Sequence, residues 1–543
     1  MLQAAEQRNS LRLANAVALV ADASDQPITE YVAENGGAAP RTSSTLTLAE
    51  RAIRNMEIRA LCEDKNYQRV KLTSCRGSVD LKLFTCMTSL RDIHVEMDGD
   101  ICNIPSLQDL PDIRRIYLSS KTMNDSDVRP LCNIETLEEI NICNSPNVVN
   151  LGNVGRLPRV HTLMVNRTGV IDEFLCGLTL SNTLRRIDLS ECLRLTDVEP
   201  LASIETLEEI DVSGCFPCVC GIGALGALPR LKILNASLTG ITDECLARLS
   251  ASQSLKKLLL SKCERLTNVS RLDTVTTLQE LDLAECKNVV SGIGSLGTLP
   301  VLQCLDLSGT GVADDDLCTL SCSATISKLI MKRCVLLTNV SPLEKLRTLQ
   351  HVNIGECINV IEGLNSFSEL PSLRTLYMHY TPVTNECLSV ISTSQSIVSL
   401  NIAACTRITD ISCLANLKTL EDVNINMCES VEKGLGDISG LSNLRMLSAR
   451  STVLDDECVK IMSSSSNLER SSLEGCAKIT DVTPLAAVKS LEYVNLDNCP
   501  VVKGIAELGK LPLLRVISVR ETNICEEDIK NLKKFNRRLY IER

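Results

Sequence analysis

The histidines and cysteines are the residues of this chain best suited to bind a metal or to act as nucleophiles. Only four histidines occur among the 543 residues, at widely separated positions: His94, His161, His351 and His379. His351 and His379 could approach each other on neighbouring strands, but no third ligand accompanies them at the spacing that a zinc site requires. We therefore predict neither a metal site nor a Cys–His catalytic pair.

Two further motifs could bind a cofactor. The segment CFPCVC at 215–220 places three thiols within six residues, but no second cluster completes the four ligands of a zinc site. The segments GIGALG at 221–226 and GIGSLG at 292–297 match the G-x-G-x-x-G pattern of dinucleotide-binding loops. Both glycine segments recur at the same place in a longer repeated phrase. We interpret all three segments as structural turns and predict no cofactor.

An internal repeat positions these residues. The pattern L-x-x-L-x-L-x-x-C begins at five positions 71 residues apart: Leu184, Leu255, Ile326, Ile397 and Leu468. Two further copies in each interval give repeats of 23, 24 and 24 residues. The L-x-L alternation predicts a short strand, and the apolar residues after it predict a return across the outer side. Because one coil cannot bury its own apolar side, neighbouring coils must stack around a continuous core.

The period and the phrase are those of leucine-rich repeats. We predict an α/β leucine-rich repeat solenoid, a horseshoe or arc of about twenty repeats with a parallel β-sheet on its concave face, over residues 66–536. Residues 1–65 are predicted to contain an N-terminal helical segment, a flexible stretch and a capping helix that starts near residue 45, and residues 537–543 form a tail. With 2% aromatic residues and no Trp, aliphatic residues and Cys must fill the core.

The three copies differ at their ninth position. Third copies carry Thr there, whereas first and second copies carry Cys: Cys192, Cys215, Cys263, Cys286, Cys334, Cys357, Cys405, Cys428, Cys476 and Cys499. A cysteine can pack inward at the bend where a strand ends, so we predict a ladder of reduced structural thiols in a reducing compartment. The third copy continues as TGITDECLARLSAS at 239–252, and this apolar spacing predicts a short helix on the convex side.

Two longer phrases carry a family resemblance. LTDVEPLASIETLEEIDVSGC at 195–215 and LDLAECKNVVSGIGSLGTLPVLQCLDLSGTGV at 281–312 resemble the trypanosomatid leucine-rich repeat proteins, including the expression-site-associated members described as adenylate cyclase regulatory proteins. The resemblance covers residues 66–543. It implies a regulatory protein that acts by binding another protein through its repeats.

The cysteine-bearing repeats also resemble those of F-box substrate receptors, so the alternative function is a substrate-recognition subunit of a ubiquitin ligase. Residues 1–65 lack the Leu-Pro start of an F-box. They also lack the Cys and His spacing of the RING segment that the expression-site-associated members carry, because Cys62 is their only cysteine. A ligase role would require an adaptor-binding helix within these residues.

Four positions of each phrase, the third, fifth, seventh and eighth, are expected on the concave face. The third position is Arg or Lys in most first copies and Glu or Asp in most second copies, which predicts cross-strand ion pairs. The fifth position is mostly Asp or Asn, which predicts a small, acidic, hydrogen-bonding floor.

That floor is interrupted where aliphatic, aromatic and basic side chains converge. Tyr and Arg are enriched at protein interfaces because they combine apolar area with a polar group. We predict that residues 255–380 hold the contact patch for a protein partner, formed by Leu259, Ile330, Lys332, Arg333, His351, Tyr377, His379 and Tyr380.

The net charge and the lengths of the apolar runs argue against some other classes of partner. A net charge of -11 argues against a protein that binds nucleic acid. No apolar run approaches the roughly 18 residues that span a bilayer, so we predict no membrane insertion, and a cytoplasmic location with the nucleus as the alternative. The sequence thus predicts a non-enzymatic scaffold that binds a protein partner on its concave face.

Overall fold

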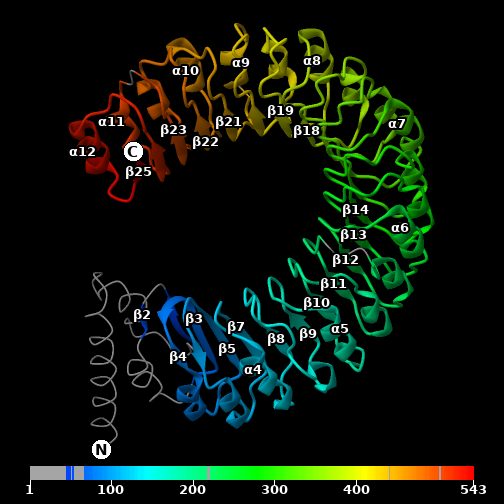
Figure 1. Ribbon diagram of the computed structural model, residues 1–543. Helices are drawn as coiled ribbons and strands as arrows, with labels where there is room; N and C mark the ends of the chain where they lie inside the picture. Colours follow the sequence, from blue (N-terminus) through cyan, green and yellow to red (C-terminus); the bar gives the residue numbers. More distant parts are fainter. Residues whose placement is uncertain (1–44, 50–51, 54–66, 217–219, 440, 501–502) are drawn as a thin grey trace, which may run out of the picture. The chain divides into compact units, whose positions relative to one another are not determined.

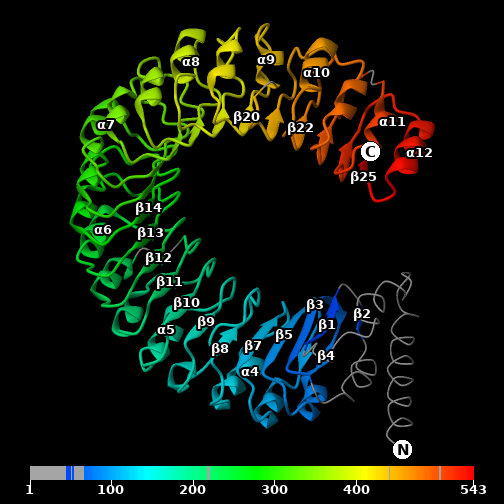
Figure 2. The same cartoon turned by 180° about the vertical axis from the view of Figure 1, so that it is seen from behind.

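The described residues form two compact units, which divide the chain at residues 265 and 266 into unit 1 (up to residue 265) and unit 2 (from residue 266). The computed structural model describes residues 45–49, 52–53, 67–216, 220–439, 441–500 and 503–543. Within each unit, short strands lie side by side on the concave side, and helices and 3-10 turns cover the convex side (Figures 1 and 2). This is the coil of a leucine-rich repeat solenoid, as predicted.

The strands of unit 1 pair in parallel and mostly in chain order. The sheet runs β1–β3–β5–β7–β8–β9–β10–β11–β12–β13. Separately, β2 pairs with the end of β3, and β4 pairs with β6. The strands are β1 (Thr45–Ala49), β2 (Ala52–Ile53), β3 (Arg69–Gly77), β4 (Val79–Asp80), β5 (Asp92–Met97), β6 (Ile101–Cys102), β7 (Arg115–Ser119), β8 (Glu139–Asn141), β9 (Thr162–Met164), β10 (Arg186–Asp188), β11 (Glu209–Asp211), β12 (Ile233–Asn235) and β13 (Lys257–Leu259).

Unit 2 has the same arrangement, with β14 to β25 paired in chain order. Equivalent positions of neighbouring repeats are in register, so side chains of one position form a row across the sheet. The strands are β14 (Glu280–Asp282), β15 (Cys304–Asp306), β16 (Lys328–Ile330), β17 (His351–Asn353), β18 (Thr375–Tyr377), β19 (Ser399–Asn401), β20 (Asp422–Asn424), β21 (Met446–Ser448), β22 (Arg470–Ser472), β23 (Tyr493–Asn495), β24 (Val516–Ser518) and β25 (Tyr540–Glu542).

Short helices recur on the convex side. In unit 1 they are α4 (Asp125–Val128), α5 (Asp172–Leu178) and α6 (Asp243–Leu249), with 3-10 turns η1 (Leu81–Cys86), η2 (Ile104–Asp109), η3 (Arg129–Asn133), η4 (Val154–Arg156), η5 (Glu199–Ser203) and η6 (Ile222–Ala227). In unit 2 they are α7 (Asp314–Leu320), α8 (Asn385–Ile391), α9 (Leu435–Ser439), α10 (Asp456–Met462), α11 (Ile505–Leu508) and α12 (Glu526–Phe535), with η7 (Ser270–Thr274), η8 (Gly294–Thr298), η9 (Ser341–Lys345), η10 (Leu364–Glu369), η11 (Ser412–Asn416) and η12 (Thr483–Ala487).

The helix predicted in the third copy is confirmed as α6. Thr242 caps it by accepting a hydrogen bond from the Cys245 amide. Two glycines of GIGALG pack against this helix: a Cβ on Gly223 would lie 2.7 Å from the Cys245 carbonyl oxygen, and one on Gly226 would lie 2.7 Å from that of Leu249. Close packing of the 3-10 turn η6 on α6 explains Gly223 and Gly226, and the left-handed φ of 82° explains Gly221, so the G-x-G-x-x-G pattern is a structural turn, as predicted.

The ninth-position cysteines close the bend after the strands of the first and second copies. Cys334 Sγ donates to the Leu307 carbonyl oxygen at 3.2 Å, and Cys357 Sγ donates to that of Met331 at 2.9 Å, in each case a carbonyl of the preceding repeat. Burial raises the pKa of the Cys405 thiol, which keeps it protonated. The ladder thus joins neighbouring coils by hydrogen bonds, in agreement with the predicted structural role.

One core position departs from the pattern. The first, fourth and sixth positions of the phrases are buried aliphatic residues almost throughout, but the fourth position of β22 is Ser471. Its side chain is fully buried, and its hydroxyl has no hydrogen-bond partner among the described residues.

The N-terminal prediction needs a correction. Thr45–Ala49 form a strand, β1, and not the start of the predicted capping helix. The segment TLTLA alternates Thr and Leu, so its period of two fits a strand that extends the sheet beside β3. Residues 1–44, 50–51 and 54–66, which hold the rest of that prediction, lie outside the described residues. No helix among the residues described has the length and apolar character needed to cross a bilayer.

Candidate protein-binding surface of unit 2

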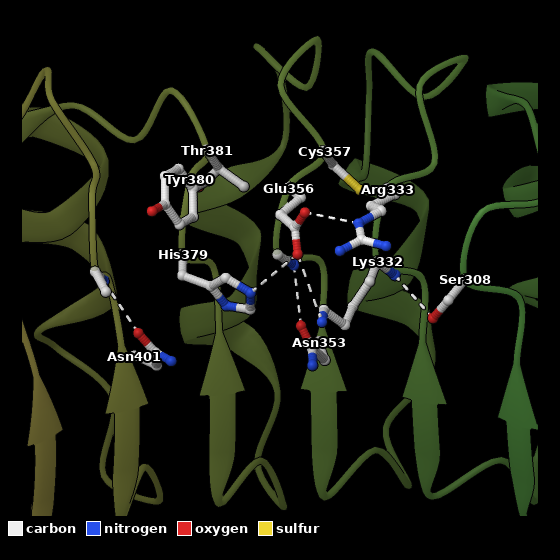
Figure 3. Close-up of polar contacts among 12 residues, drawn as sticks. Ser308, Lys332, Arg333, Asn353, Glu356, Cys357, His379, Tyr380, Thr381 and Asn401 are labelled. Carbon is white, nitrogen blue, oxygen red and sulfur yellow. Dashed lines mark hydrogen bonds and ion pairs between the residues drawn. The ribbon is translucent and has the colours of Figure 1, made fainter. Parts of the chain in front are cut away.

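The Asp and Asn side chains of the fifth position are used by the fold itself. Asn353 Oδ1 accepts a hydrogen bond from the Gly355 amide at 3.0 Å, and Asn401 Oδ1 does the same for the Ala403 amide (Figure 3). Each such bond caps the end of its strand. The floor predicted from these residues is therefore mainly a row of structural caps.

Two predicted patch residues, Ile330 and Leu259, interrupt this row because another group supplies the cap. The Lys332 amide donates to Ser308 Oγ of the preceding repeat at 3.2 Å (Figure 3), and in unit 1 the Ser261 amide donates to Ser237 Oγ at the same distance. An apolar residue at the fifth position then leaves no buried amide unpaired. Leu259 ends β13 in unit 1, whereas the other predicted patch residues belong to unit 2.

The eighth position of the repeats adopts a left-handed backbone. The φ angle is 57° at Arg333, 64° at Glu356 and 55° at Tyr380. A non-glycine residue in this region is uncommon and costs about 1 kcal/mol. The strain recurs along the array and sets the eighth-position side chains in one row beside the sheet.

Glu356, in that row, is the centre of a cluster of polar and charged side chains from the seventh and eighth positions of three neighbouring repeats. Arg333 Nε donates to Glu356 Oε2 at 2.7 Å, Lys332 Nζ lies 3.5 Å from Oε1, and His379 Nε2 lies 3.8 Å from Oε1 (Figure 3). Arg333 also reaches back two repeats to Glu285 Oε1 at 3.4 Å, past Gly309, which has no side chain. The structure thus brings Lys332, Arg333 and His379 together around a glutamate that the sequence analysis did not select.

The protonation states of this cluster follow from its contacts. The hydrogen bond from Arg333 lowers the pKa of Glu356, which therefore stays ionised at neutral pH. Burial and the charge of Lys332 lower the pKa of His379, and the opposing effect of Glu356 is smaller. His379 is therefore neutral at pH 7, and the cluster is two cations around one shared anion.

His379 is held by its packing. Its ring covers Gly355, where a Cβ would lie only 2.0 Å from His379 Cε1. Its Nδ1 is buried without a hydrogen-bond partner among the described residues. The glycine at this seventh position provides the space that the imidazole occupies.

The predicted aromatic residues lie beside this cluster. His351 and Tyr377 make an edge-to-face contact with ring centroids 5.4 Å apart. Tyr380 is 47% exposed, and its hydroxyl lies 3.7 Å from Met427 Sδ in the same eighth-position row. Burial lowers the pKa of His351, with a smaller contribution from Lys328. All seven predicted patch residues of unit 2 thus lie on β16, β17 and β18 or in the turns that follow them.

The turns after β16 and β17 add an aliphatic surface that the sequence analysis missed. Val335, Leu336, Ile358 and Ile361 are 53%, 53%, 61% and 65% exposed. Asn359 Nδ2 donates to the Val335 carbonyl oxygen at 2.8 Å, so the two turns are adjacent. We call these four residues the aliphatic turns.

Comparison between repeats shows that the aliphatic turns are not demanded by the fold. One 71-residue step further on, the positions of Val335 and Leu336 are occupied by Thr406 and Arg407, and those of Ile358 and Ile361 by Glu429 and Glu432. The replacement of polar by aliphatic residues at these positions is visible in the sequence and could have identified this surface. In unit 1, Leu193 and Phe216 are a smaller exposed pair in the equivalent turns.

One of the predicted third-position ion pairs lies within unit 1. In unit 1, Arg186 Nη2 lies 2.7 Å from Glu209 Oε2, as expected. In unit 2, by contrast, Arg470 lies over the Tyr493 ring at 5.1 Å from its centroid, and Lys328 is in register with His351. The predicted cross-strand ion pair is therefore confirmed between Arg186 and Glu209, whereas His351 and Tyr493 belong to second copies that carry a ring in place of an acidic residue at this position.

The fold and the surface define the class of protein: a leucine-rich repeat solenoid with an exposed polar and aliphatic surface beside its sheet. No group of three or more His, Cys, Asp or Glu in the described part of the chain could hold a metal. No protein-family model matches the chain.

Individual proteins share the repeats. The chain is 26% identical over 260 residues to the "Putative adenylate cyclase regulatory protein" of Trypanosoma equiperdum, which covers 47% of this chain and 37% of that protein. It is 27% identical over 275 residues to the "Putative disease resistance protein At4g19050" of Arabidopsis thaliana, which covers 50% of this chain and 22% of that protein. The chain therefore matches well under half the length of these relatives.

Two solved structures share the fold. The mouse RP105/MD-1 complex superimposes with a TM-score of 0.55 at 15% identity, over 93% of this chain and 95% of the matched chain. The TLR13–ssRNA13 complex gives a TM-score of 0.52 at 15% identity, over 90% and 86%. At this level of identity the likeness shows the fold alone.

Proposed function

We propose that this protein is a non-enzymatic scaffold that binds a protein partner through unit 2. The proposed contact surface combines the Glu356 cluster, the rings of Tyr377 and Tyr380, and the aliphatic turns. The observation that carries the proposal is the exposure of four aliphatic side chains in adjacent turns, at positions that are polar one step later in the array.

A protein is the partner that fits this surface best. Exposed contiguous aliphatic side chains next to aromatic and arginine side chains are typical of protein interfaces. A polyanion would gain little here, because Glu285 and Glu356 already pair with Arg333. We include Leu259 of unit 1 in the proposal only as a separate contact.

The likeness to the trypanosome protein supports a regulatory role, in which binding changes the activity of the partner. The ubiquitin-ligase alternative stays a prediction, because it depends on residues 1–65.

Capture of partners by paired variants tests the proposal. Full-length protein carrying Val335→Lys and Ile358→Lys should lose at least tenfold of the partner signal in affinity purification from its own cells, because a complex would have to bury two unpaired charges. The matched control is Thr406→Lys, which adds a lysine at the equivalent position one step later and should leave capture unchanged. A second variant with Arg333, Tyr377 and Tyr380 all changed to Ala tests the polar half.

Quantitative mass spectrometry measures the captured proteins, and circular dichroism checks that each variant is folded. An unchanged partner profile in both folded test variants would refute a binding role for this surface. Equal losses in the Thr406→Lys control would mean that the array is generally sensitive to added lysines, and would refute the assignment to these turns.

A further inference from the structure

A second set of side chains, on the sheet of unit 1, has no part in the surface described above. These side chains line a hollow of about 450 Å³, on the side of the sheet that carries the third and fifth positions of the repeats. Its polar and aromatic lining includes Arg69, Asp92, His94, Arg115, Tyr117 and Glu139.

Two arginines in this hollow are held in place by one carboxylate. Arg115 donates to Asp92 from Nε at 2.8 Å and from Nη2 at 2.9 Å, and Arg69 Nε lies 3.0 Å from the same carboxylate. The Asp92 side chain is only 16% exposed, while those of Arg69 and Arg115 are 59% and 46% exposed. Asp92 therefore orients both guanidinium groups with a single carboxylate, and Glu139 in register with Arg115 is the second acidic group beside them. Each guanidinium keeps N–H groups that can bind a further anion.

The neighbouring side chains add cationic and aromatic character. His94 stacks flat on Tyr117, with ring centroids 3.8 Å apart and an angle of 2° between the rings. Lys71 is in register with His94 on the adjacent strand. His94 Nε2 is buried without a partner among the described residues. Burial lowers the pKa of His94, with a smaller contribution from Lys71, so its ring is neutral and stacks as an aromatic platform.

The hollow is lined from five adjacent strands, β3, β5, β7, β8 and β9. At the usual strand spacing of about 4.8 Å, these span roughly 19 Å. An extended peptide covers about 3.3 Å per residue, so the hollow has the length of about six residues. Glu139, on β8 in register with Arg115, is the second carboxylate of the lining, and the far end on β9 carries Thr162 and Met164. The sheet continues with the neighbouring carboxylates Asp188 and Asp211.

We propose that this hollow of unit 1 binds an extended peptide segment of a protein partner through one carboxylate of that segment, held by Arg69 and Arg115. The two guanidinium groups form a site for one anion. A nucleic acid, which brings a phosphate at every residue, would meet Asp188 and Asp211 along the same sheet and be repelled. The occupant is therefore a peptide with a single acidic side chain at the Arg69–Arg115 end, followed by residues that pack on His94 and Tyr117.

Selection from a random ten-residue peptide library displayed on phage, with the full chain as bait, tests the proposal. Enriched sequences should share an Asp or Glu. A fluorescein-labelled synthetic copy in which Asn or Gln replaces that residue should bind roughly tenfold or more weakly by fluorescence anisotropy, which is the usual size of a lost charge-assisted contact. In Arg115→Gln and Arg69→Gln the difference between the acid and amide peptides should nearly vanish.

The matched control is Arg186→Gln, which removes another partly exposed, ion-paired arginine at the same repeat position and should leave the acid preference intact. The Val335→Lys and Ile358→Lys variant should also bind these peptides normally, so failure of the proposed function and failure of this inference are distinguishable. Absence of an acid preference, or a preference that survives both arginine substitutions in folded protein, would overturn the inference. Arg115-dependent binding of a labelled ten-nucleotide RNA would overturn it in favour of a nucleic-acid site.

Discussion

The packing of His379 on Gly355 predicts that Gly355→Ala destabilises the protein. A Cβ at Gly355 would lie 2.0 Å from His379 Cε1 and 2.4 Å from Nε2, so Gly355→Ala must expel the ring. Overpacking of this kind costs about 1–3 kcal/mol. Gly355 has no positive φ, so the backbone itself accepts Ala.

The same substitution should have the opposite effect when the ring is absent. In a His379→Ala background the clash disappears, and Gly→Ala should stabilise by about 0.4–1 kcal/mol because the unfolded chain loses freedom. The double-mutant cycle should therefore give a coupling free energy of about 2 kcal/mol between the two positions.

Hydrogen exchange measured by mass spectrometry is the suitable assay. The chain has no Trp, and long repeat arrays need not unfold in one step, so a local opening free energy from peptides that cover β17 and β18 is more informative than a global one. Ala403→Gly, at the same seventh position of a later repeat, measures the intrinsic difference between Ala and Gly. A coupling below about 0.3 kcal/mol would refute the contact, because independent sites are additive within that margin.

Two further predictions concern buried polar groups of unit 2. Ser471→Val replaces a hydroxyl that has no partner among the described residues and lies between Leu447 and Val494, and it should stabilise the β22 region by about 1–2 kcal/mol in the same exchange assay. Unchanged or faster exchange would contradict it. Because burial and Lys332 lower the pKa of His379, the folded state favours the neutral ring, so its contribution to stability is complete above about pH 6.5 and is lost as the pH falls below the unfolded value. His379→Gln should therefore flatten the fall of local stability between pH 7 and 5, measured as the opening free energy of peptides that cover β17 and β18 in the same exchange assay, and an unchanged slope would count against a neutral His379.

The fold could be predicted from the sequence because every repeat carries the same pattern of buried and exposed residues. The L-x-L alternation, the 71-residue step and the Cys or Thr at the ninth position each predict one local element, and the stacking of coils then follows from burial alone. The error at Thr45–Ala49 arose where the repeat is absent, since a five-residue alternation competes with the helical spacing of the residues after it.

The candidate site was only partly accessible from the sequence. Chain order placed Lys332 and Arg333 two coils before His379, with the coil of β17 between them, because equivalent positions in a repeat must align. It could not show that the eighth position is left-handed, since Arg333, Glu356 and Tyr380 are none of the residues that usually mark such a turn. It therefore missed Glu356, whose role depends on side-chain distances across three repeats.

Periodicity by itself determined the secondary structure, the core and the side of the sheet on which each residue lies, because these follow from local geometry and burial. Only the tertiary structure decided which charges share a partner and which are left over. Asp92 contacts two arginines at once, and Asn353 Oδ1 accepts the hydrogen bond that caps its strand. Such pairings depend on the reach and direction of side chains from different coils, which the spacing of residues along the chain does not encode.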